Sequence, residues 1–125
     1  MRLLPTRRLP VAALLAAAGL LLPACTSHTP GEAAESVVRR FFAQLPEGDC
    51  AKLGELMVAR SQESCADTVR ELNEHTVRLQ EVLSTQVDGR SPDAVMVHAR
   101  MSYGAHVKAQ LLRVERHAGT WRLRL

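Results

Sequence analysis

The chain has 125 residues, a formal net charge of +3 and few aromatic side chains, namely two Phe, one Tyr and one Trp. The charge equals that of Arg2, Arg7 and Arg8, so the residues after them carry equal numbers of acidic and basic side chains. Nucleic-acid binding needs a clustered basic surface, and single strands also need aromatic platforms, so we expect no nucleic-acid partner.

The first 24 residues have the pattern of a secretory signal peptide. Three arginines precede an apolar run from Val11 to Leu22 that contains no charged residue. A basic segment, a short apolar segment and then small residues are typical of such a leader. The run is shorter than the roughly 20 residues that a membrane-spanning helix needs. We therefore predict that residues 1–24 are a cleaved signal peptide.

The segment Leu22-Pro23-Ala24-Cys25 closes this run and resembles the lipobox of bacterial lipoproteins. The resemblance implies that the Cys25 thiol receives a diacylglycerol, that the leader is cut before it, and that the new amino group is acylated, for example with palmitate. Two or more acyl chains anchor a protein stably, whereas one chain binds only weakly. The implied location is the cell membrane or the outer membrane, with the protein facing the periplasm or the exterior.

Two further cysteines follow a polar segment. Residues 25–34 are expected to form a tether, and residues 35–125 a single small domain. If Cys25 is lipidated, Cys50 and Cys65 remain as an even pair in an oxidising compartment, where disulfides persist. A bridge between them would close a loop of roughly 15 residues and contribute about 3 kcal/mol. The alternatives are free thiols or metal ligands, although no Cys-x-x-Cys spacing accompanies them.

Helical periodicity dominates the first half of the domain. The segment Glu32–Leu45 carries one apolar stripe at spacings of three and four, formed by Ala34, Val37, Val38, Phe41, Phe42 and Leu45. Asp49 can cap a second helix, and a third pattern follows from Ser61. The apolar positions of these two helices are Leu53, Leu56 and Met57, and then Cys65, Val69 and Leu72. A disulfide would therefore join the second helix to the third.

The second half of the domain changes to strand-like alternation. Four strands are expected, over 76–88, 95–103, 106–116 and 121–125, with tight turns between them. We expect an irregularity near Val82-Leu83 and a switch of face at Leu111-Leu112. Helices followed by strands predict an α+β fold in which N-terminal helices pack on an antiparallel four-stranded meander.

Several segments together resemble the nuclear-transport-factor-2-like superfamily, and most of all its branch of small uncharacterised bacterial lipoproteins. They are the first amphipathic helix, Gly48-Asp49-Cys50, Asp88-Gly89 before the strand Ala94–Val97, and the final Gly119-Thr120-Trp121-Arg122-Leu123. The resemblance implies a curved, cone-like sheet with helices inside its concave face. It also implies a pocket or a homodimer in many members.

Two classes of function fit this sequence. The first is a non-catalytic module that binds an envelope protein or a small apolar ligand; the second is a small pocket enzyme, isomerase-like or hydrolase-like. Candidate pocket residues are Phe41, Phe42, Tyr103 and Trp121. An enzyme would need an acid beside the Tyr103 hydroxyl, and no Asp or Glu shares its strand face. We predict no metal and no cofactor, because the histidines are scattered and no phosphate-binding glycine loop occurs.

Overall fold

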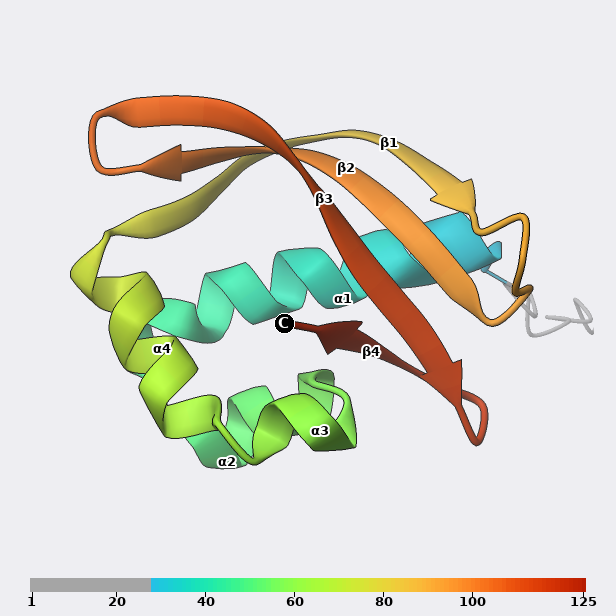
Figure 1. Cartoon of the computed structure of the whole chain (residues 1–125), viewed down its shortest axis with the longest axis horizontal. Coiled ribbons are helices and arrows are strands. Elements are labelled where there is room, and N and C mark those ends of the chain that lie inside the picture. Colours follow the sequence, from blue (N-terminus) through green and yellow to red (C-terminus); the bar gives the residue numbers. More distant parts are fainter. Residues whose placement is uncertain (1–27) are drawn as a thin grey trace, which may run out of the picture.

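The computed structural model describes residues 28–125, which form an α+β fold (Figure 1). The helices are α1 (Pro30–Gln44), α2 (Cys50–Leu53), α3 (Ala59–Gln62) and α4 (Cys65–Glu74), with 3₁₀ turns at Leu45–Glu47 and Gly54–Leu56. The strands are β1 (Val77–Val87), β2 (Ala94–Tyr103), β3 (His106–His117) and β4 (Thr120–Arg124). They form one antiparallel sheet in chain order, so the predicted α+β class, with helices before a four-stranded antiparallel sheet, is confirmed. The predicted signal peptide and Cys25 lie outside the described residues.

Helix α1 begins earlier than the sequence pattern predicts. Residues 30–34, expected in the polar tether, form its first turn instead. The Thr29 side chain accepts a hydrogen bond from the backbone N–H of Glu32 at 3.2 Å, and Pro30 occupies the first helical position. Proline lacks a backbone N–H, and it is well tolerated at the first helical position because an N–H there would have no partner within the helix. Pro30-Gly31 therefore begins the helix rather than ending it.

The core lies between α1 and the sheet. Helix α1 contacts all four strands, and Figure 1 shows it running along the face over which the sheet curves. Its apolar stripe is buried as predicted: Phe41, Val38 and Ala34 are fully inaccessible to solvent. Removing this stripe from water is the main favourable contribution that a domain of this kind can make.

A disulfide joins Cys50 in α2 to Cys65 in α4, which confirms the predicted pairing. The Cα atoms are 6.1 Å apart, within the range that such bonds require. The cap of α2 is also confirmed, because the Asp49 carboxylate accepts from the backbone N–H of Ala51 at 2.9 Å. Capping and bridging together fix the short helices, which are too brief to persist alone.

The sheet register confirms one predicted irregularity and corrects another. Strand β1 has register shifts between Leu79 and Glu81 and between Val82 and Ser84, close to the expected position. Strand β3, by contrast, pairs with β2 without a break, so the expected switch of face at Leu111-Leu112 does not occur. Leu112 is buried, whereas Leu111 is 60% exposed on the opposite face. Two adjacent leucines therefore reflect one buried and one exposed position of a regular strand.

Strand β4 is held at its free edge by the segment that leads into α3. Met57 forms a parallel bridge with Leu123, and the Val58 N–H donates to the Leu123 carbonyl at 2.9 Å. The Ser61 hydroxyl lies 3.1 Å from the Leu125 N–H and 3.2 Å from its carbonyl oxygen. These contacts bring residues 57–61 beside the outward-facing arginines of β4.

Candidate functional site

The four candidate pocket residues do not share one hollow among the three surface hollows described below. Phe41 and Phe42 are core residues whose rings meet edge to face, with centroids 5.1 Å apart. Trp121 and Tyr103 are half-buried and pack against the core. Phe42 and Trp121 line different hollows, and neither Phe41 nor Tyr103 lines any of the three. The aromatic side chains therefore contribute mainly to packing.

The surroundings of Tyr103 are amide and cationic. Its hydroxyl donates to the side-chain oxygen of Gln110, and the Lys108 ammonium lies 4.8 Å from the ring centroid. Burial raises the pKa of the phenol above its ordinary value. The alternative enzyme would need an acidic side chain beside this hydroxyl, and Gln110 is a neutral amide.

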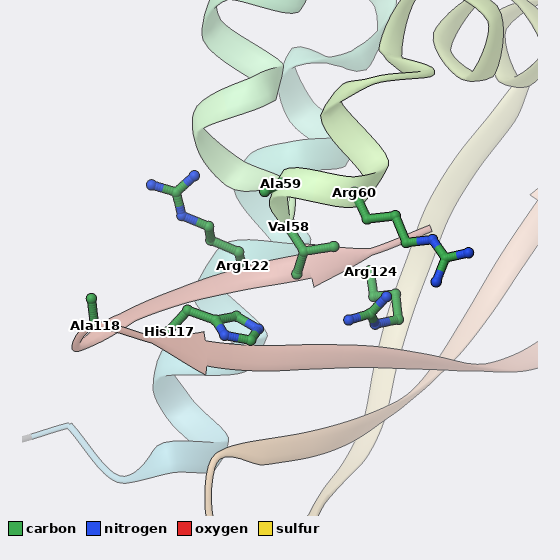
Figure 2. Close-up of a pocket in the computed structure, with 7 residues that line it drawn as sticks. All are labelled: Val58, Ala59, Arg60, His117, Ala118, Arg122 and Arg124. Atoms are coloured by element: carbon green, nitrogen blue, oxygen red, sulfur yellow. The ribbon is translucent and has the colours of Figure 1, made fainter.

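The largest described hollow has a volume of about 400 Å³ and lies at the junction of the β3–β4 hairpin with residues 58–60. We call it the basic hollow. Figure 2 shows its lining residues: Val58, Ala59, Arg60, His117, Ala118, Arg122 and Arg124. Val58 lies at its centre, and Arg60 and Arg122 extend away from one another on opposite sides of Val58 (Figure 2).

Local sequence explains how these side chains come together. Strand alternation directs Leu123 into the core and Arg122 and Arg124 to the outer face. The hairpin turn has positive φ angles at Ala118 and Gly119, of 50° and 80°, as two-residue turns between twisted strands require. Arg60 arrives from the first turn of α3.

A buried carboxylate, that of Glu115, contacts two residues that line the basic hollow, His117 and Arg124. Glu115 is only 8% exposed and accepts hydrogen bonds from Arg113 at 2.8 Å and from Arg124 at 2.7 Å. The His117 ring lies 3.0 Å from the same carboxylate, and Arg113 also donates to Asp88 at 2.8 Å. The hydrogen bonds from Arg124 are the main reason that the pKa of Glu115 lies far below its ordinary value. Glu115 in turn raises the pKa of Arg124.

We expect Glu115→Gln to lower the free energy of unfolding by about 1.5–3 kcal/mol at pH 7, because charge-assisted hydrogen bonds are lost. The folded-state pKa of Glu115 is depressed, so its contribution is complete above the unfolded-state value of about 4.5 and is lost progressively as the pH falls from there toward the folded-state pKa. The difference between wild type and variant should therefore shrink in acid, as measured by urea unfolding at pH 7 and pH 3.

Glu55→Gln is a matched control for this comparison. Glu55 is exposed, and no ion pair or side-chain hydrogen bond involves it within residues 28–125. Its substitution should change stability by less than about 0.5 kcal/mol at both pH values. A Glu115→Gln effect that is independent of pH would contradict the assigned charge state.

The net charge of the basic hollow comes from two arginines. Glu115 and Asp88 balance Arg113 and Arg124 within their network. Within residues 28–125, by contrast, no carboxylate forms an ion pair with Arg60 or Arg122. Arg122 makes one long contact, 3.5 Å to the Met57 carbonyl oxygen. Two guanidinium groups are therefore available to an anion.

The second hollow, of about 360 Å³, lies on the other side of the same hairpin. It is lined by the start of the described chain, the N-terminal part of α1, the turn and the start of β4: His28, Glu32, Ala33, Ser36, Val37, Arg40, Gly119, Thr120 and Trp121. The His28 ring lies 3.5 Å from the Glu32 carboxylate, and the Arg116 guanidinium lies 5.1 Å from the Trp121 ring centroid. The start of the described chain thus adjoins the hairpin that borders the basic hollow.

The third hollow is smaller, about 220 Å³, and includes Phe42, Arg39 and Arg78 in its lining.

Among residues 28–125, no three His, Cys, Asp or Glu side chains lie close enough together to form a metal site. Within the same range, no helix has the length and apolar character needed to cross a membrane.

The basic hollow was not foreseen from the sequence. Alternation places Arg122 and Arg124 on the outer face of the last strand, but no local pattern indicates that Val58 and Arg60 lie beside them. No family model and no curated protein matches the chain, so no functional residues can be assigned to it from a relative.

Proposed function

We propose that the protein is a lipid-anchored module of the cell envelope that binds a ligand without catalysing a reaction. The observation that carries this proposal is the segment Leu22-Pro23-Ala24-Cys25 at the end of a short apolar leader. Cys25 would hold the protein on the cell membrane or the outer membrane, with the domain facing the periplasm or the exterior. Acylation at two sites would make this attachment stable.

Two features of the domain support an envelope location and a binding role. The Cys50–Cys65 disulfide suits an oxidising compartment. Phe41 and Phe42 are buried in the core, so a ligand would bind on the outer surface of the domain. The pocket-enzyme alternative would rest on Tyr103, whose hydroxyl donates to an amide rather than to an acid.

The nuclear-transport-factor-2-like relationship is part of the same proposal. Helices that precede a four-stranded antiparallel sheet, with α1 along one face, support it. The cone-like shape of the sheet and the homodimer are proposed from that relationship alone. No contact within residues 28–125 bears on either of them.

Replacement of Cys25 by alanine tests the anchor. We expect the wild type to remain in the membrane fraction after a high-salt wash, and Cys25→Ala to lose the lipid, which mass spectrometry of the purified protein would detect. The double variant Cys50→Ala/Cys65→Ala is the matched control, and it should keep both the lipid and the membrane association. An unmodified Cys25 in the native protein would refute the proposal.

A further inference from the structure

We propose that Arg60 and Arg122, on the rim of the basic hollow, bind phosphate groups of anionic lipids in the membrane that holds the anchor. This inference rests on the proposed lipid attachment at Cys25 and adds a second contact between protein and bilayer. It assigns a ligand class, the anionic phospholipid headgroup, to the largest hollow described in the domain.

The length of chain between anchor and domain places the basic hollow near the bilayer. His28 follows Cys25 by three residues, a separation that extended chain can span to at most about 11 Å. His28 lines the second hollow together with Gly119 and Thr120 of the hairpin turn. Ala118 in the same turn lines the basic hollow. A tether of nine or ten residues would have let the domain take any orientation relative to the bilayer. The observed α1 begins at Pro30, so the tether is shorter than that.

The charges near this hairpin complement an anionic surface. Arg60 and Arg122 have no carboxylate partner among the described residues, whereas Arg40 lines the adjoining second hollow together with Glu32. Guanidinium groups suit phosphate because their planar donors match its oxygens. A lipid anchor combined with basic residues also meets the general need for two membrane signals.

The geometry favours a surface of headgroups over a single free phosphate ion. Arg60 and Arg122 point away from each other across Val58 (Figure 2), so they do not converge on one small anion. Neighbouring headgroups in a bilayer present several phosphates side by side, and each arginine can contact a different one. The anchor would also keep these headgroups at high effective concentration.

Trp121 provides a built-in reporter, because it is the only tryptophan of the chain and lines the hollow on the other side of the hairpin. The processed protein would be purified from membranes in a neutral detergent. It would then be reconstituted into phosphatidylcholine vesicles, with or without phosphatidylglycerol, that contain brominated acyl chains. We expect stronger quenching of Trp121 fluorescence in the anionic vesicles, and we expect this difference to decrease with added salt.

The decisive variant is Arg60→Gln/Arg122→Gln, and Arg70→Gln/Lys108→Gln removes the same charge as its control. The control residues lie in α4 and in the β2–β3 hairpin, at the end of the molecule away from the start of α1 (Figure 1). At about fivefold for each arginine, the first pair should weaken the preference for anionic vesicles about 25-fold, measured by flotation in the Cys25→Ala background. Arg60→Gln alone, at an exposed position, should produce about a fivefold loss if the double variant does not fold.

The possible outcomes separate the two proposals. Flotation of the lipidated protein with neutral vesicles measures the anchor alone, and its absence would refute the anchor but not the arginine contact. Equal quenching in neutral and anionic vesicles, or an equal effect of both double variants, would overturn the headgroup site. Saturable binding of inorganic phosphate in detergent, abolished by Arg60→Gln/Arg122→Gln and unaffected by anionic lipid, would identify a free-phosphate site and also overturn it.

Discussion

Replacing Phe41 with alanine should lower the free energy of unfolding by about 3–5 kcal/mol, enough to unfold a large share of a marginally stable small domain. The Phe41 side chain is fully buried at the centre of the core, and its ring packs edge to face on Phe42. Truncation removes apolar contact and leaves a cavity that the surrounding helix and sheet cannot completely fill. Urea unfolding of the protein in a neutral detergent would measure the change.

Leu111→Ala is the matched control for this prediction, since Leu111 is also apolar but is 60% exposed. It should change stability by less than about 0.5 kcal/mol. Comparable losses for the two variants would show that α1 does not occupy the core as described.

Removing the disulfide should have the second-largest effect. We expect Cys50→Ala/Cys65→Ala to lower the free energy of unfolding by about 2–5 kcal/mol, mainly because the unfolded chain gains freedom when the loop is opened. α2 and α4 would then be held by packing and by the Asp49 cap. Urea unfolding under non-reducing conditions would measure this loss.

Reductant provides an internal control for the disulfide. Dithiothreitol should destabilise the wild type by a similar amount and leave the double variant unchanged. Alkylation followed by mass spectrometry should detect no free thiol at Cys50 or Cys65 before reduction. A wild type that is insensitive to reductant would contradict a stabilising bridge.

Periodicity and local chemistry predicted much of the fold. The apolar stripe of the first helix, the Asp49 cap and the irregularity in β1 each follow from neighbouring residues, and each is present. The sequence pattern predicts too late a start for α1 because Thr29-Pro30-Gly31 has the composition of a loop. In the folded chain the same residues supply a cap and a compatible first helical position.

The candidate site was harder to predict because it depends on contacts between distant parts of the chain. The contacts of Met57 and Val58 with Leu123, and of Ser61 with Leu125, bring Arg60 beside Arg124. The local pattern of β3 does not reveal that Glu115 is buried, because Arg124 of the neighbouring strand helps to cover it. Alternation identifies the face on which a side chain lies, and it does not identify which side chains from other elements cover it.

The two borders of the sheet determine where neighbouring copies would meet if Cys25 is acylated as proposed. β1 is interrupted by two register shifts, and β4 is short and bridged by Met57. β4 pairs only with residues 113–117 of β3, so residues 106–112 of β3 have no strand partner within residues 28–125 on that side of the sheet. Strand addition between neighbouring copies would therefore occur along this free part of β3 rather than along β1 or β4.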